Sequence, residues 1–180
     1  TMIASCIPKW GYSHSMAEIT TEYPEYYIGC LNSIVFDYLI RCKLNSNFIT
    51  HGVLYQCPVP DIKRVETKIL NKINSNILEL TYTSWDIKPF ADDVWKEADI
   101  DLKAAITKQW EGNKKITGGH EWEPPEWCEI DKDGCKLPPF KWDEERRAVL
   151  KAELDAIYAK LYGLTTEELR YILDPQDVYG

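Results

Sequence analysis

The chain lacks any long hydrophobic run and any segment that resembles a secretory signal. No stretch of its 180 residues approaches the roughly 18 consecutive apolar residues that a membrane-spanning helix needs. No positively charged segment followed by an apolar core is present either. We therefore expect a soluble, cytoplasmic protein without a membrane partner.

Motifs for cofactor binding and nucleophilic chemistry are also missing. The sequence has no glycine-rich nucleotide loop, no Gly-x-Ser-x-Gly elbow and no His-Glu-x-x-His zinc motif. Its three histidines, His14, His51 and His120, are far apart in the sequence. Acidic pairs at 92–93 and 144–145 are typical of solvated helix starts rather than of a nuclease centre. We predict no catalytic, cofactor or metal site in this chain, so an independent enzyme is the least favoured interpretation.

The six cysteines include no Cys-x-x-Cys pair. They are scattered and lie mostly inside apolar runs, which is typical of reduced, buried thiols in a cytosolic protein. Cys128 and Cys135 flank a glycine-containing turn, and a zinc site that also uses His120 is the alternative. A closed zinc site usually needs four ligands at tight spacing, so reduced thiols are the preferred interpretation.

The residues that are present indicate a globular protein with an uneven charge. Hydrophobic residues make up 44% and aromatic residues 12% of the chain, which is enough to build a core. The formal net charge is −8, yet residues 1–64 hold five basic and five acidic residues and are neutral. Because binding to phosphates depends on clustered lysine and arginine, the N-terminal third is the better candidate for contact with DNA.

Two apolar runs predict a small antiparallel sheet. The run 2–7 is ended by Pro8, and the run 52–57 stops at the Pro-Val-Pro of 58–60. We expect these two strands to pair with each other. The abrupt apolar start of the chain suggests a piece of a longer protein. The predicted fold class is α+β, predominantly helical, with this sheet near the N-terminus.

Helical periodicity covers most of the remaining chain. Apolar residues recur at helical spacing over 27–42 and 62–80 and, less regularly, over 92–110. Asp143 is an expected N-cap for a helix that Gly163 ends, and Thr165 with Glu168 fits a capping box for a last short helix. The predicted organisation is a target-recognition part (1–61), a helical connector (62–111), an ordered aromatic loop rich in proline and glycine (112–142) and a C-terminal helical pair (143–180).

Three blocks of sequence resemble one known family. The first is Leu-Asn-Ser-Ile-Val-Phe-Asp-Tyr at 31–38 with Gln-Cys-Pro-Val-Pro at 56–60, preceded by the opening run 1–8. The second is Glu-Leu-Thr-Tyr-Thr-Ser-Trp-Asp at 79–86 with Pro-Phe-Ala at 89–91. The third is Pro-Pro-Phe-Lys-Trp-Asp-Glu-Glu-Arg-Arg at 138–147, with Glu-Leu-Asp-Ala at 153–156 and Leu-Tyr-Gly-Leu at 161–164. In this order they resemble the C-terminal, target-recognition region of type IIG-like restriction-modification enzymes, which are adenine-specific DNA methyltransferases.

The resemblance implies a non-catalytic fragment that recognises double-stranded DNA as part of a bacterial enzyme. The family's S-adenosylmethionine loop and Asn-Pro-Pro-Tyr tetrad are not in this chain, so the cofactor is expected on the parent's catalytic domain. Where many relatives have a Gly-Gly pair after the recognition helix, residues 44–47 are Leu-Asn-Ser-Asn, which puts the loop geometry and the sequence preference in doubt. Asn and Arg or Lys side chains can read adenine edges and bind guanine or phosphate, respectively. The candidate DNA contacts are Lys9, His14, Arg41, Lys43, Asn45 and Asn47.

Two alternatives stay open at this stage. Residues 45–47 can simply terminate a helix, and Arg41 can be an ordinary surface charge. The whole chain can instead be a protein-interaction or scaffold module that supports the catalytic domain without touching DNA. Four tryptophans would then be candidate anchors, although local core packing explains them as well: Trp110, Trp122, Trp127 and Trp142.

Overall fold

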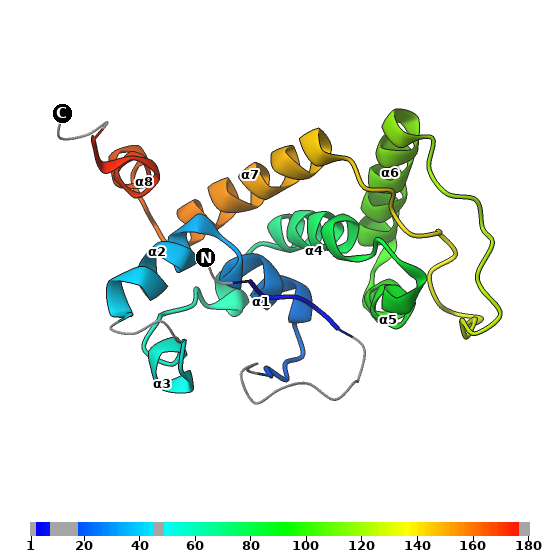
Figure 1. The fold of residues 1–180 in the computed structure, drawn as a ribbon, viewed down its shortest axis with the longest axis horizontal. Helices are drawn as coiled ribbons and strands as arrows, with labels where there is room; N and C mark the ends of the chain where they lie inside the picture. The colour runs from blue at the N-terminus through cyan, green and yellow to red at the C-terminus, as the bar shows by residue number, and fades with distance from the viewer. Residues whose placement is uncertain (1–2, 8–17, 45–48, 177–180) are drawn as a thin grey trace. The chain divides into compact units, whose positions relative to one another are not determined.

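The computed structural model describes residues 3–7, 18–44 and 49–176, and all regular secondary structure in these ranges is helical (Figure 1). It consists of eight α-helices, α1 to α8, and two short 3-10 helices, η1 and η2. None of these helices has the length and apolar character needed to cross a bilayer. The expected antiparallel sheet is wrong, because the described ranges contain no β-strand.

Both segments that we expected to be strands adopt other conformations. Residues 3–7 form no regular secondary structure, and the backbone of Ala4 exchanges two hydrogen bonds with the side chain of Asn32. The run 52–57 begins inside α3 (His51–Leu54), because the Thr50 hydroxyl accepts a hydrogen bond from the Val53 amide and starts a helical turn. A short apolar run next to turn residues does not distinguish a strand from a helical turn, which explains the error.

The helix expected over 27–42 is in fact two helices, α1 (Pro24–Leu31) and α2 (Ile34–Lys43). Asn32 Nδ2 donates a hydrogen bond to the Ile28 carbonyl of α1. Ser33 Oγ donates to the Cys30 carbonyl and accepts from the amide of Phe36 in α2. Side chains that bond to the nearby backbone compete with the helical ladder, so this pair ends one helix and caps the next.

The chain forms two compact units, each described here by itself. The first consists of Thr1–Ala4, Tyr12–Val65 and Lys151–Gly180. It contains α1, α2, α3, η1 (Ile62–Arg64), α8 (Thr166–Leu173) and the second part of α7 (Glu144–Leu161). Residues from both parts of the sequence share one core, whose large buried members are Tyr26, Leu31, Val35, Phe36, Ile40, Leu154 and Tyr158.

The second unit consists of Ser5–Gly11 and Glu66–Leu150. It contains α4 (Thr67–Thr81), η2 (Trp85–Ile87), α5 (Lys88–Glu97), α6 (Ile100–Thr117) and the start of α7. The helix predicted over 62–80 corresponds to α4, while 62–64 form η1 instead. The less regular pattern over 92–110 is split between α5 and α6, because Asp99 caps α6 by accepting a hydrogen bond from the Leu102 amide.

The helix termini predicted near the end of the chain are confirmed. Asp143 Oδ1 accepts a hydrogen bond of 2.8 Å from the Arg146 amide at the start of α7. Gly163 follows α7 with a φ of 76°, a left-handed conformation that glycine adopts without strain. Thr165 and Glu168 form both halves of a capping box at the start of α8.

The irregular segment is shorter than predicted, because α6 continues to Thr117 and ends at Gly118, which has a φ of 81°. Residues 118–143 contain no helix and are fastened to the helices of the second unit by hydrogen bonds. Trp110 Nε1 donates to the Pro138 carbonyl, and the amide of Phe140 donates to the carbonyl of Tyr82. This segment is therefore an ordered loop on the second unit.

Candidate nucleic-acid interface

The C-terminal end of α2 carries the two predicted DNA contacts that the structure describes. Ser33 caps the helix, and Val35, Phe36 and Ile40 bury one face of it. Arg41 lies on the opposite face, whereas Lys43, in the last turn, lies on the same side as the buried residues; both are exposed. Two cations at the C-terminal end of a helix are also favourable for its dipole, so their placement has a structural reason besides any role in binding.

Arg41 and Lys43 differ in how their charges are used. Arg41 Nε lies 2.7 Å from Asp37 Oδ2, one helical turn earlier, and its side chain is 59% exposed. Lys43 is exposed, and it lies near the thiol of Cys57, whose pKa is raised by burial and lowered again in part by this ammonium group. Both side chains can reach a phosphate, but Arg41 would do so while neutralised in part by Asp37.

A hollow of about 360 Å³ lies beside α2 in the first unit. Its volume is at the lower end of the range of small-molecule sites, and its walls are mainly apolar and aromatic. Residues of α1, α2, α3 and the segments on either side of them line it: Glu18, Ile19, Thr20, Tyr27, Leu31, Phe36, His51, Leu54, Tyr55 and Val59. Such walls suit a flat apolar group better than a phosphate. The sequence analysis did not find this site, because its lining comes together only when the helices pack.

The remaining predicted contacts, Lys9, His14, Asn45 and Asn47, lie outside the described residues. Of the six candidates, the described residues therefore include Arg41 and Lys43, which lie two residues apart in the last turn of α2. The surface itself also needs correction. The predicted sheet is absent from the described part of the first unit, where all regular secondary structure is helical, so the described candidate surface is the end of α2.

The first resembling block has both buried and exposed residues. Leu31, Val35 and Phe36 are buried, and the amide of Ile34 donates a 2.8 Å hydrogen bond to Asp155 Oδ1 in α7. Burial raises the pKa of Asp155, while this hydrogen bond from Ile34 opposes that effect. The buried residues of this block contribute to the core of the first unit, while Asn32, Gln56 and Pro58 are exposed.

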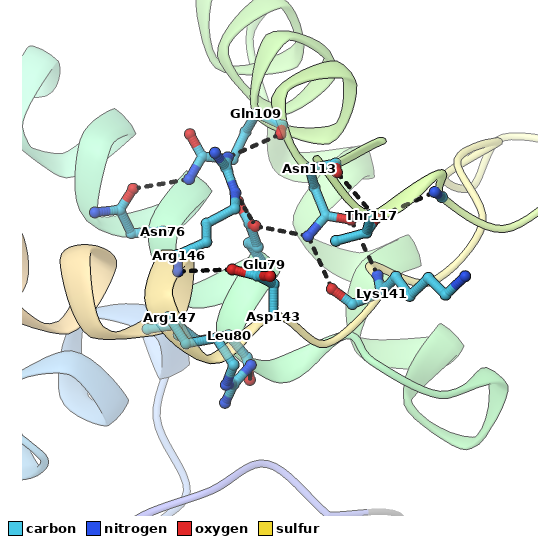
Figure 2. A network of polar contacts seen from close by, with 11 residues as sticks. Asn76, Glu79, Leu80, Gln109, Asn113, Thr117, Lys141, Asp143, Arg146 and Arg147 are labelled. Carbon is cyan, nitrogen blue, oxygen red and sulfur yellow. Dashed lines mark hydrogen bonds and ion pairs between the residues drawn. The ribbon is translucent and has the colours of Figure 1, made fainter. Parts of the chain in front are cut away.

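The second and third blocks meet in a polar network (Figure 2). Glu79 is 2% exposed and accepts two hydrogen bonds from Arg146, of 2.5 Å at Nε and 2.9 Å at Nη2. Asn113 Nδ2 donates to both Glu79 Oε1 and the Lys141 carbonyl, and Asn113 Oδ1 accepts from the Lys141 amide. This network ties α4, α6, the loop and α7 together, so these polar groups serve the fold.

A buried ion pair that the sequence analysis missed holds the loop at its other end. Lys88 is 1% exposed, and its Nζ lies 2.5 Å from Asp92 Oδ1 and donates to the Cys135 carbonyl. Asp92 Oδ1 also accepts a hydrogen bond from the Cys135 amide. The available signal was the spacing of Lys88 and Asp92 by one helical turn, but this spacing occurs on many exposed helix faces.

The alternative zinc site is not assembled in the described part of the chain. Within those ranges no three His, Cys, Asp or Glu side chains gather in a way that could hold a metal ion. Cys135 is completely buried against Lys88 and Asp92, and burial raises the pKa of its thiol. All six cysteines are free thiols.

Comparisons with known proteins give no match: no family model fits the chain, and no curated protein and no solved structure is similar to it.

Proposed function

We propose that this chain is the DNA target-recognition and scaffold part of an adenine-specific DNA methyltransferase of the restriction-modification type. In this proposal the reacting groups and the S-adenosylmethionine site are on a separate catalytic domain, which is the chain's protein partner. Such an enzyme acts on bacterial DNA in the cytoplasm, where six free thiols are ordinary. Two exposed cations on α2, Arg41 and Lys43, contribute to the contact with the duplex.

One observation carries this proposal: the blocks that resemble the family are bonded to one another across long sequence separations. The Tyr162 hydroxyl of the third block donates to the Pro58 carbonyl of the first. Arg146 and Arg147 of the third block donate to Glu79 and to the carbonyl of Leu80 in the second. These contacts make residues of different blocks part of shared hydrogen-bond networks, which is expected if the blocks belong to one fold.

The experiment selects binding sites from a pool of random duplex DNA. It uses the chain alone and the chain joined to the proposed catalytic domain. Changing both cations in R41A/K43A should weaken DNA binding and flatten its salt dependence, because each phosphate contact releases counterions. The control changes Lys63 and Arg64 to Ala; both belong to η1 of the same unit and are exposed.

The outcomes distinguish DNA contact by the α2 cations from nonspecific attraction between DNA and any exposed cation. An equal loss of DNA binding in K63A/R64A would remove the α2 surface from the proposal. Methyl transfer to DNA by this chain alone, or a preceding gene region unrelated to DNA modification, would overturn the proposed function as a whole.

A second candidate function is a scaffold that supports the catalytic domain without touching DNA. The net charge of −8 favours it, because an acidic chain repels the phosphate backbone. Association of this chain with the separately expressed catalytic half, without any selection of DNA sequences, is the result that this alternative predicts.

A further inference from the structure

The loop over residues 118–136, here named the acidic loop, exposes apolar side chains in acidic surroundings. Trp127 is 61% exposed, Ile130 46% and Trp122 37%. The loop has six acidic and two basic residues, and four glutamates between and beside its tryptophans are exposed: Glu121, Glu123, Glu126 and Glu129. Single exposed apolar residues are ordinary, but three within nine residues of one loop form a surface feature.

The acidic loop is held in place by groups that are expensive to bury. The Lys88 ammonium bonds to Asp92 and to the Cys135 carbonyl near the end of the loop. The same ammonium lies 5.4 Å from the ring centroid of Trp122, which stacks edge-on against Trp85 at 5.2 Å. Trp122 near the start of the loop and Cys135 near its end therefore both contact the Lys88 ammonium. Leaving this buried ammonium unpaired would lower the stability of the protein by several kcal/mol.

Two cations in or near the loop, Lys96 and Lys136, form contacts within the second unit. Lys96 Nζ lies 2.5 Å from Asp131 Oδ2, and this contact lowers the pKa of Asp131. Lys136 Nζ donates to the backbone carbonyl of Asp131. These lysines hold Asp131 in place, so the charge that the loop presents to solvent is mainly that of its glutamates.

An ordered loop of this length without secondary structure is typically functional rather than a mere connection. A surface that is already fixed loses little conformational entropy on binding, and exposed tryptophans are common centres of protein interfaces. Carboxylates around such a centre favour a partner of opposite charge, and guanidinium groups stack well on indole rings.

We propose that the acidic loop binds a surface rich in arginine and lysine on another protein, with Trp127 at the centre of the contact. DNA carries the same charge sign as the loop, and so does a second copy of this chain, whose net charge is −8. The proposal does not depend on DNA recognition by α2, because the loop and α2 belong to different units.

The test titrates the full chain into a fluorescent peptide in which arginine and lysine alternate with leucine and alanine, and follows anisotropy. W127A and E126K should each raise the dissociation constant by about tenfold or more, the range seen when a central interface residue is lost. Two matched controls lie outside the loop. W142A removes another tryptophan, 59% exposed, and E111K makes the same charge change on an exposed position of α6.

The controls decide between a defined surface and general attraction of charges. The proposal is supported when both loop variants lose affinity and both controls retain it, with helix content unchanged in circular dichroism. It is overturned if E111K weakens binding as much as E126K, if W142A weakens it as much as W127A, or if the peptide does not bind. Tighter binding of duplex DNA than of the basic peptide, lost in W127A, would also overturn it.

Discussion

Glu79 and Arg146 form an ion pair whose loss should be costly, since the carboxylate is 2% exposed. Changing Arg146 to Met leaves the Glu79 carboxylate buried. Asn113 is then the remaining side-chain donor to it among the hydrogen bonds drawn in Figure 2. Removal of one member of a buried pair typically costs about 3–5 kcal/mol, so we expect a decrease of this size in the free energy of unfolding. Urea denaturation followed by circular dichroism measures it.

Two further variants show whether burial of the Glu79 carboxylate causes the loss of stability expected in R146M. The double variant E79L/R146M should recover most of the loss, because no buried charge remains unpaired. R41M breaks an exposed pair with Asp37 and should cost less than about 1 kcal/mol. Equal losses in R41M and R146M would contradict the structural role of the network.

Gly134 is a second residue where a small change should have a large effect. A Cβ added there would collide with the Asp92 carboxylate, which is itself fixed by Lys88. We expect G134A to lower the free energy of unfolding by about 1–3 kcal/mol, as for other overpacked sites. In the control G52A the nearest atom is 3.7 Å away, so thermal denaturation should show little change. If G52A were destabilised and G134A were not, the close approach of Gly134 to the Asp92 carboxylate would be contradicted.

At the scale of elements, the start of α8 offers a test of local stability. The Thr165 hydroxyl accepts from the Glu168 amide, and the Glu168 carboxylate accepts from the Thr165 amide and hydroxyl. T165A should cost about 0.5–2 kcal/mol, the usual range for a lost N-cap. T166A, at the exposed first position of the same helix, is the control and should change the unfolding midpoint little.

The capping box also predicts a pH dependence. Hydrogen bonds from the Thr165 amide and hydroxyl lower the pKa of Glu168 below its ordinary value of 4.5. The stabilisation is therefore fully present above pH 4.5 and is lost as the pH falls through the lower, folded-state pKa. The free energy of unfolding, measured as the pH is lowered, should show this loss in the unsubstituted chain and not in E168Q. The same acid dependence in both proteins would exclude Glu168 as its source.

The elements differ in how well their sequences predicted them. Periodicity located α4 and α7, because each of these helices buries an apolar stripe. The capping box located α8, which has no buried residue. The break at Asn32 and Ser33 was missed, since both side chains bond to the backbone inside an otherwise unbroken apolar pattern. Among the candidate contacts, Arg41 is exposed because it lies off the apolar stripe, whereas Lys43 lies on the apolar side and is exposed at the end of α2. The hollow beside α2 and the Lys88 pair depend on contacts between distant residues, which local patterns do not reveal.

For the molecule as a whole, the first unit is built from both ends of the sequence. Tyr158 in α7 donates a 2.6 Å hydrogen bond to the Tyr26 carbonyl and packs so closely that a Cβ on Gly29 would lie 2.7 Å from its hydroxyl oxygen. Cys30 is fully buried in the same core and lies 3.4 Å from the Tyr162 hydroxyl. The second part of α7 is therefore part of the core that surrounds α1, although 132 residues of sequence separate Tyr158 from Tyr26.

This arrangement predicts the effect of removing residues 151–180. The intact protein should react quickly with a thiol reagent at the exposed Cys42 and slowly at Cys30, because burial excludes the reagent and raises the pKa of the Cys30 thiol to about 11. In the truncated chain Cys30 loses Tyr158 and Tyr162 and should react about as fast as Cys42. Cys135 belongs to the second unit and should stay protected as an internal control. Mass spectrometry of the labelled peptides measures all three rates, and a Cys30 that remains protected without residues 151–180 would show that α1 and α2 fold independently of the C-terminal helices.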